Sequence, residues 1–318
     1  MTLLLRATVL YLLAGGVFVA IFRDSPLDLL RGIFSVLPGS FTLFLMLAWW
    51  VIPVFAVMLL LVPWRELLAR LPRAFIAIFL CMLFFLVFTM LKTSLPYALP
   101  FWADPLMARV DRALFFGADP WDVAHRLEGW VNLRWAGLIY FRAWVMPAMF
   151  APVLLILFDA DEARQRRFFL IYFFVWIGLG NILALIFLSG GPVYYDALVG
   201  GETFAGLTQA LKDSGVADSG IGALQADLWR AYSEGLQKAG SGISAFPSVH
   251  IGIVTMFALY LFERSRWFAP LSVALVATFV FLSVYLGWHY IVDGYFSILA
   301  VVLLWRFLRK RELTPGSD

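Results

Sequence analysis

The amino-acid sequence predicts an all-α fold, a polytopic integral membrane bundle of about eight transmembrane helices. Three observations support this prediction: the composition, the length of the apolar stretches, and the distribution of basic residues between them. Of the 318 residues, 63% are hydrophobic and 14% are charged, against about 45–50% and about 25% in soluble domains. So much apolar surface requires a bilayer as its solvent, which excludes disordered chains, coiled coils and ordinary cytosolic enzymes.

The apolar stretches have the length of membrane-spanning helices, which need about 20 residues to cross roughly 30 Å of hydrocarbon. The first stretch ends in Phe18-Val19-Ala20-Ile21-Phe22, which has no small-residue cleavage pattern, so we expect a retained helix rather than a signal peptide. The predicted spans cover residues 3–22, 41–62, 74–91, 136–158, 168–188, 249–263, 268–287 and 290–308.

Basic residues concentrate at alternate ends of these spans, while the short loop at the opposite ends holds only Arg23 and Arg31. Because arginine and lysine mark cytoplasmic loops, we expect both termini in the cytoplasm. The long loops 92–135 and 189–248 are then expected on the periplasmic or lumenal side. The basic residues of the expected cytoplasmic side are Arg6, Arg65, Arg70, Arg73, Arg164, Arg166, Arg167, Arg264, Arg266, Arg306, Arg309, Lys310 and Arg311.

Both long loops contain segments with helical periodicity. In the first, Asp119 is placed as an N-cap and Pro120 as the first helical residue. The apolar residues that follow, up to Trp135, predict one amphipathic helix in the membrane interface, with His125 also interfacial. In the second loop, residues 206–238 predict an ordered cap.

The remaining composition excludes other classes of site. The single cysteine, Cys81, lies in an apolar run, which excludes a disulfide framework and a cysteine metal site. A net charge of +3 without a long basic tract gives no case for nucleic acid as a partner. The sequence identifies no protein partner.

The first histidine motif, at residues 244–252, reads Ser-Ala-Phe-Pro-Ser-Val-His-Ile-Gly at the entrance to the sixth span. Pro247 suits the first turn of a helix. The N–H groups of Ser248, Val249 and His250 would then face outward as an anion site, which the His250 side chain could contact. An interfacial histidine that only caps the helix is an equal alternative.

The second motif, at residues 283–293, reads Ser-Val-Tyr-Leu-Gly-Trp-His-Tyr-Ile-Val-Asp between the last two spans. His289 and Asp293 are four residues apart, so on one helix they can hydrogen-bond. A carboxylate on one imidazole nitrogen makes the other a better nucleophile or base. A structural pair that ties two spans together is the alternative.

Topology brings both motifs to the outer membrane face. Two histidines, one with an aspartate partner, beside a helix N-terminus suit phosphoryl transfer, with one histidine attacking phosphorus and the other protonating the leaving oxygen. Metal binding is a weaker interpretation, because no further ligand is evident. We therefore expect neither a metal nor another cofactor.

These motifs resemble those of a known family. Phe-Pro-Ser-Val-His is similar to the second motif of the type 2 phosphatidic acid phosphatase superfamily, usually Pro-Ser-Gly-His, and the segment ending in His289 and Asp293 resembles its third motif. The resemblance implies that His289 forms a phosphohistidine, Asp293 orients it and His250 is the general acid. It also implies three regions: two additional N-terminal helices in residues 1–73, a six-helix catalytic core in residues 74–311, and a tail in residues 312–318.

The sequence also departs from that pattern. The arginine and serine that open the third motif fall on Ser283 and Leu282. The first motif, a lysine followed by an Arg-Pro, is replaced by Ser-Gly-Gly-Pro-Val-Tyr-Tyr at residues 189–195. This segment and Phe-Pro-Ser-Val-His look more like the fungal inositol phosphorylceramide synthase branch, whose members transfer a head-group phosphate between lipids.

Phosphate ligands must then come from elsewhere. Arg142, inside the fourth span, is the first candidate, unless it snorkels or pairs with Asp104 or Asp111. Lys92 is another, with snorkelling as the favoured alternative. The other candidates are Ser248, Tyr194 and Tyr195, the tyrosines being alternatively part of an aromatic belt. Asn181 is expected to hydrogen-bond another helix.

The sequence thus predicts a lipid phosphotransferase or phosphatase with a metal-independent, outward-facing site. Its partners would be a membrane lipid and either water or a polar head-group acceptor. A polyprenyl-phosphate or polyprenyl-diphosphate phosphatase is the alternative enzyme. A non-catalytic lipid transporter or binding protein is the alternative of another class.

Overall fold

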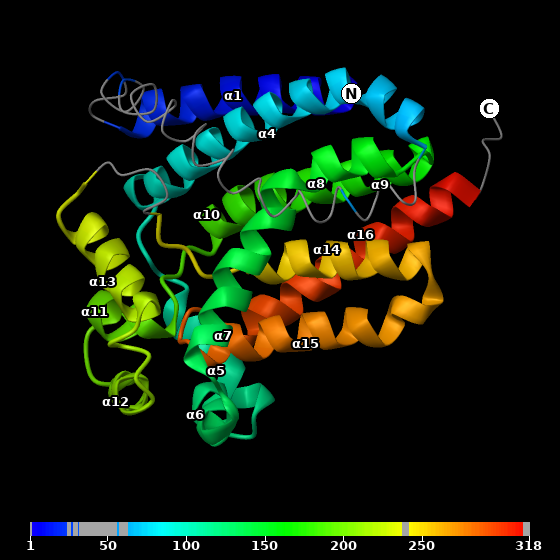
Figure 1. The fold of residues 1–318 in the computed structure, drawn as a ribbon. Coiled ribbons are helices and arrows are strands. Elements are labelled where there is room, and N and C mark those ends of the chain that lie inside the picture. Colours follow the sequence, from blue (N-terminus) through cyan, green and yellow to red (C-terminus); the bar gives the residue numbers. More distant parts are fainter. Residues whose placement is uncertain are drawn as a thin grey trace.

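The computed structural model describes residues 2–23, 63–236 and 242–313, together with residues 27, 31 and 56. Within these ranges the chain is all α-helical, and its long helices run side by side as a bundle (Figure 1). The predicted span 41–62 lies outside the described residues. Each of the other seven predicted spans corresponds to a helix or to a continuous helical segment.

The long helical segments follow the predicted apolar stretches closely. Five of them, among the described residues, are long and apolar enough to cross a membrane, which identifies an integral membrane protein. All seven segments that match predicted spans, within the described residues, are α1 (Thr2–Phe22), α4 (Trp64–Ala98), α7–η3–α8 (Leu133–Gly137, Leu138–Ala143 and Trp144–Phe158), α9–η4–α10 (Glu162–Phe173, Phe174–Leu183 and Ala184–Ile186), α14 (Val249–Arg264), η6–α15 (Arg266–Phe268 and Ala269–Tyr285) and α16 (Ile291–Leu313).

Helix α14 lies at the centre of the bundle, packed against α8, η4, α15 and α16. The N-terminal helix α1 packs along α4, and the contact is close at Gly15, where an added Cβ would lie 2.8 Å from Val87 Cγ1. The Tyr11 hydroxyl of α1 donates a hydrogen bond to Asn181 Oδ1 of η4. Asn181 therefore links two helices, as expected from its place in an apolar span.

The first long loop does not form one interfacial helix, so that prediction is wrong. It forms α5 (Asp104–Leu114), α6 (Pro120–His125) and η2 (Glu128–Trp130) before α7 begins. Pro120 does open a helix after Asp119, but the Asp119 carboxylate binds Arg112 at 2.7 Å rather than capping that helix. A new helix starts because Asn132 caps α7 by accepting the Trp135 N–H.

His125 packs inside the protein. The ring is buried, Nε2 lies 2.9 Å from the Tyr285 carbonyl oxygen, and the imidazole stacks on the Tyr285 ring at 4.3 Å. The second long loop is ordered where the structure describes it. Its helices are α11 (Tyr195–Val199), α12 (Ala205–Asp213) and α13 (Gly220–Ser233).

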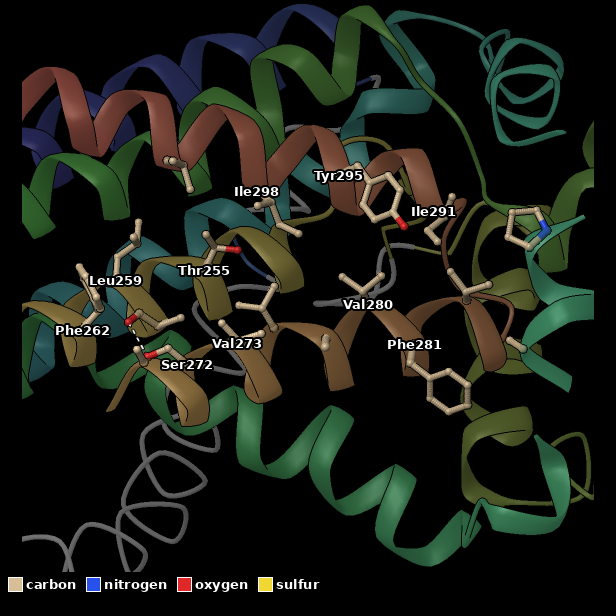
Figure 2. Close-up of a pocket in the computed structure, with 18 of the residues that line it drawn as sticks. Thr255, Leu259, Phe262, Ser272, Val273, Val280, Phe281, Ile291, Tyr295 and Ile298 are labelled. Carbon is tan, nitrogen blue, oxygen red and sulfur yellow. Dashed lines mark hydrogen bonds between the residues drawn. The ribbon is translucent and has the colours of Figure 1, made fainter. Parts of the chain in front are cut away.

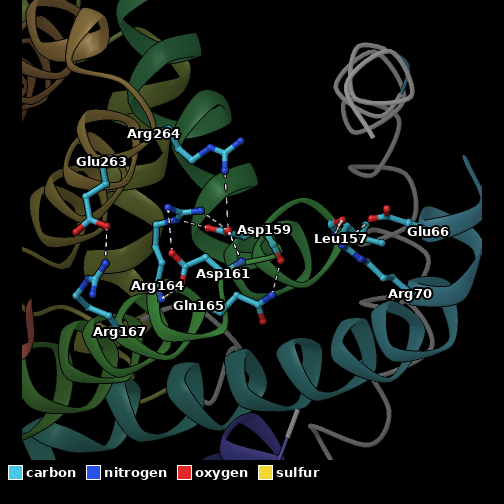
Figure 3. A network of polar contacts seen from close by, with 10 residues as sticks. All are labelled: Glu66, Arg70, Leu157, Asp159, Asp161, Arg164, Gln165, Arg167, Glu263 and Arg264. Carbon is cyan, nitrogen blue, oxygen red and sulfur yellow. Dashed lines mark hydrogen bonds and ion pairs between the residues drawn. The ribbon is translucent and has the colours of Figure 1, made fainter. Parts of the chain in front are cut away.

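At the other end of the bundle, the arginine-rich helix ends are joined by a polar network (Figure 3). Arg164 binds both oxygens of the buried Asp159 at 2.5 Å. Arg167 of α9 pairs with Glu263 of α14 at 2.6 Å and with Glu312 of α16. These ion pairs fix three helices relative to one another at the end opposite the histidines.

Candidate active site

Three loop segments meet at the end of the bundle that carries both histidine motifs. They are residues 189–195 before α11, residues 242–248 before α14, and residues 286–290 between α15 and α16. Backbone hydrogen bonds join them: Ala245 N donates to Ser189 O at 2.8 Å, and Val193 N to Gly287 O at 3.0 Å. The segment that replaces the expected first motif thus holds the other two motifs together.

His289 and Asp293 form the hydrogen bond that their spacing predicts. His289 Nδ1 lies 3.1 Å from Asp293 Oδ2, and both side chains are buried. His289 belongs to the loop and Asp293 to the first turn of α16, so they do not share one helix. The same carboxylate oxygen accepts the Tyr290 N–H at 3.1 Å, which fixes the carboxylate against the loop.

Ser248 contacts the other nitrogen of the His289 ring. Its Oγ lies 3.3 Å from Nε2 and also accepts the Ile251 N–H, which makes Ser248 the N-cap of α14. A hydroxyl that accepts from Ile251 can donate its own hydrogen to Nε2. The ring is then protonated on Nδ1, toward Asp293, and carries its lone pair on Nε2.

The predicted place of Pro247, in the first turn of this helix, is wrong. α14 begins at Val249, so Pro247 lies before the cap rather than in the first turn. The Ser248 N–H, expected to face an anion, instead donates to the Asp293 carbonyl oxygen at 3.3 Å. The N-cap serine therefore connects the two histidine motifs.

The His250 ring lies 6.1 Å from the His289 ring, measured between centroids. It is sandwiched between Tyr140, at 4.9 Å and nearly parallel, and Trp144, at 3.9 Å. Trp144 Nε1 also donates to the His250 carbonyl oxygen at 3.2 Å. Two residues one turn apart in η3 and α8 thus hold the second imidazole in place.

Lys92, near the end of α4, brings a positive charge close to the histidines. Burial is the main cause that lowers the pKa of His289, and the Lys92 ammonium is the second. A neutral imidazole is the form that can act as a nucleophile. The chain passes close to the Lys92 backbone at Gly242, where an added Cβ would lie 2.6 Å from the Lys92 carbonyl carbon.

Asp104, at the start of α5, holds the segment that replaces the first motif. Its carboxylate accepts the N–H groups of Gly190 and Gly191 at 2.8 and 2.9 Å and the Tyr290 hydroxyl at 2.9 Å. Gly191 has φ of +97°, and a Cβ there would lie 2.5 Å from Trp288 O. Glycine is needed at this position on both counts.

Asp111, two turns further along α5, binds the start of α16. Its carboxylate accepts the N–H groups of Ile291 and Val292 at 2.9 and 3.0 Å, and burial raises its pKa to about 7. The sequence predicts neither role, because it indicates both aspartates only as possible partners of Arg142. One sequence feature could have indicated these roles: Asp104 and Asp111 are seven residues apart, which places both on one face of an amphipathic helix.

The remaining candidate phosphate ligands differ in what surrounds them. Arg142 lies in the π-helical segment η3, and its side chain is outside the described part. The Tyr194 hydroxyl donates to Gln225 O at 3.0 Å, within the outer cap. The Tyr195 ring packs on Phe204 at 4.9 Å. The structure thus brings Lys92 and Ser248 to the histidines and gives Tyr194 a partner of its own.

Buried polar atoms near the histidines lack a hydrogen-bond partner among the described residues. They include the Tyr140 hydroxyl, Trp288 Nε1 and Asp293 Oδ1. Such groups are rare in native proteins because desolvation without a partner is costly. The first two are donors whose bonds a bound anion could satisfy, and sequence reasoning did not single them out.

An apolar groove of about 750 Å³ runs along the helices beside this site (Figure 2). Its floor is α14 and its walls are α15 and α16, from Ile291 next to the loop at residues 286–290 to Trp305, about 20 Å along α16. Thr255 and Ser272 donate their hydroxyls to backbone carbonyls, so the groove offers a hydrocarbon-like surface.

The described residues hold no cluster of three or more His, Cys, Asp or Glu side chains arranged to bind a metal ion. Metal independence stays a prediction that an experiment must test.

Comparison with known proteins agrees with the motifs. The family model described as the PAP2 superfamily matches residues 105–307, more than half of the chain and including both histidines and Asp293. No curated protein and no solved structure shows significant similarity to the sequence. Because the match extends from α5, which anchors the site, to the last helix of the bundle, the chain belongs to the PAP2 superfamily.

Proposed function

We propose that this protein is a membrane lipid phosphotransferase or phosphatase that works through a phosphohistidine at His289. The observation that carries the proposal is the orientation of His289, whose Nδ1 lies 3.1 Å from Asp293 Oδ2 and whose Nε2 lies 3.3 Å from Ser248 Oγ. With Nδ1 protonated toward Asp293, Nε2 carries the lone pair that can attack phosphorus. A carboxylate in that position stabilises the imidazolium that forms when the other nitrogen becomes bonded to phosphorus.

The reaction has two steps. In the first, His289 Nε2 attacks phosphorus, the bond from phosphorus to the leaving oxygen breaks, and His250 donates a proton to that oxygen. In the second, water or an acceptor hydroxyl loses its proton to His250 and attacks phosphorus, and the phosphorus–nitrogen bond breaks. Both histidines then return to their starting states.

The phosphoryl group requires donors around its oxygens. Lys92 supplies a cation near His289, and the Tyr140 hydroxyl and Trp288 Nε1 are buried donors without a partner in the described part. The hydrogen bond from Ser248 Oγ to His289 Nε2 must break when Nε2 bonds to phosphorus. The Ser248 hydroxyl can then donate to a phosphate oxygen. Arg142 remains the proposed guanidinium ligand.

A lipid substrate is supported by the groove between α15 and α16, which offers a hydrocarbon-like surface beside the catalytic loop. The arginine-rich ends at the far side of the bundle support the proposed orientation, with the termini in the cytoplasm and the histidines facing the periplasm or a lumen. The Gly-Gly-Pro segment supports a transferase of the inositol phosphorylceramide synthase type.

The decisive experiment incubates the purified protein with a native lipid extract and follows phosphorylated products by mass spectrometry, with His289→Ala as the control. Free phosphate would identify a phosphatase, and a new head-grouped lipid a transferase. Turnover should resist EDTA and be inhibited by vanadate, which resembles pentacoordinate phosphorus. Saturable lipid binding with no turnover on any lipid would contradict the proposal and favour a binding protein.

A further inference from the structure

A second cavity, of about 770 Å³, opens at the arginine-rich end of the bundle. Four elements form it: the start of α1, the start of α4, the end of α8 and the start of α9. Figure 1 shows these elements at the end of the bundle that carries the N-terminus of α1, far from the start of α14. The cavity is therefore separate from the histidine site.

Four arginines contribute to the lining: Arg6, Arg70, Arg73 and Arg166. The lining also holds two carboxylates. Asp159 is buried and already bound at both oxygens by Arg164 (Figure 3), which leaves Glu162 as the second acidic group. The side chains that line this cavity therefore carry more positive than negative charge.

The arginines are only partly engaged with the protein. Arg70 donates to Leu157 O at 2.9 Å and pairs with Glu66 at 3.1 Å. Arg6, Arg73 and Arg166 are exposed and form no ion pair within the described residues. Like charges converging on one cavity repel unless an anion binds between them, and guanidinium forks match phosphate oxygens in pairs.

The same cavity has an apolar part, formed by Leu3, Ile156 and Phe169. A small soluble anion would leave this surface without a partner. A phospholipid satisfies both parts, because its phosphate can meet the arginines while the start of an acyl chain covers the apolar residues. Basic pockets between transmembrane helices commonly bind anionic lipid head groups in this way.

We propose that this cavity binds the phosphate-bearing head group of an anionic phospholipid, in the leaflet opposite the one that holds the histidine site. The bound head group bridges α1, α4 and α9. It therefore fastens the N-terminal helix, which precedes the segment matched to the superfamily, to the catalytic core. This inference is independent of what the histidines catalyse.

The test compares two triple variants that each lose three positive charges at the same end of the bundle. The cavity variant is Arg6→Gln, Arg73→Gln and Arg166→Gln. The matched control is Arg65→Gln, Arg309→Gln and Arg311→Gln, whose exposed arginines lie outside the cavity lining, over aromatic rings. Purified proteins in detergent are titrated with phosphatidylglycerol, phosphatidylcholine or inorganic phosphate, with the thermal unfolding temperature and native mass spectrometry as readouts.

Phosphatidylglycerol should raise the unfolding temperature of the wild type and the control, and phosphatidylcholine should not. The cavity variant should bind phosphatidylglycerol at least about tenfold more weakly. Equal weakening in both variants would overturn the proposal in favour of general surface charge. Equal protection by inorganic phosphate would overturn the lipid assignment in favour of a soluble anion.

Any lipid bound at the histidine site is common to all the proteins compared, so it cannot produce a difference between the two variants. If the triple cavity variant fails to fold, the exposed single variant Arg73→Gln replaces it, with Arg309→Gln as its control. A wild-type affinity in Arg73→Gln would then count against the site.

Discussion

Replacing Asp104 with asparagine tests whether one carboxylate of α5 holds the active-site loops. In the protein, Oδ2 accepts the Gly190 N–H, while Oδ1 accepts the Gly191 N–H and the Tyr290 hydroxyl. Asparagine offers one acceptor oxygen and one NH₂ donor, so either orientation leaves a buried glycine N–H facing another N–H. A lost hydrogen bond to a buried charged group costs about 1.5–3 kcal/mol.

We therefore expect Asp104→Asn to lower the free energy of unfolding by about 2–3 kcal/mol. Turnover should also fall, because Gly191 packs on Trp288 beside the proposed nucleophile. The assay is denaturant or thermal unfolding of the purified protein in detergent, with lipid turnover measured on the same preparation.

Two variants calibrate this result. Asp122→Asn removes an exposed carboxylate that pairs with Arg126 on α6, and should cost at most about 0.5 kcal/mol. Tyr290→Phe removes only the third hydrogen bond and should cost about 1 kcal/mol. If Asp104→Asn is as stable and active as Asp122→Asn, the carboxylate does not hold the loops and the argument is refuted.

The other predictions concern catalysis, pH and topology. His289→Ala should abolish turnover in a folded protein, while Asp293→Asn should lower the rate severely without eliminating it; an active His289→Ala protein would end the mechanism. Asp111 has a pKa raised to about 7, so its contribution to stability is fully present below about pH 4 and is lost as the pH rises through 7. Asp111→Asn should remove that loss in unfolding experiments at several pH values, and an unchanged pH dependence would refute this assignment. Arg142→Lys should lower kcat/KM if a guanidinium binds phosphate in bidentate fashion; normal kinetics in this variant and in Arg142→Gln would exclude Arg142 as a ligand. A cysteine at Lys212 in a cysteine-free background should react with impermeant reagents from outside, and labelling only from the cytoplasmic face would invert the proposed orientation.

The helices were predictable because their signal is local. A run of apolar residues such as 168–188 predicts a membrane-spanning helix wherever it lies in the chain. The described structure has a helical segment at seven of the predicted spans, and five helices are long and apolar enough to cross a membrane. The hydrogen bond between His289 and Asp293 was predictable for the same reason, since the two residues are neighbours in sequence.

The support of the site was not predictable, because it depends on contacts between distant segments. Nothing in the residues around Asp111 indicates that its carboxylate binds N–H groups at position 291, far along the chain. His125 has an interfacial sequence context but is buried against Tyr285 for a similar reason. The break before α7 arises from a competing cap at Asn132, which apolar periodicity does not reveal.

The close approach of Gly191 to Trp288 has a consequence for motif grafting. The loop at residues 189–195 is shaped to fit the carbonyl group of a neighbouring loop, and its conformation is set by glycine. Installing the Lys and Arg-Pro pattern typical of the superfamily there would place a Cβ only 2.5 Å from that carbonyl oxygen, unless glycine is kept at position 191. Transplants between this chain and its relatives should therefore exchange residues 189–195 and 286–290 together, as one matched cassette.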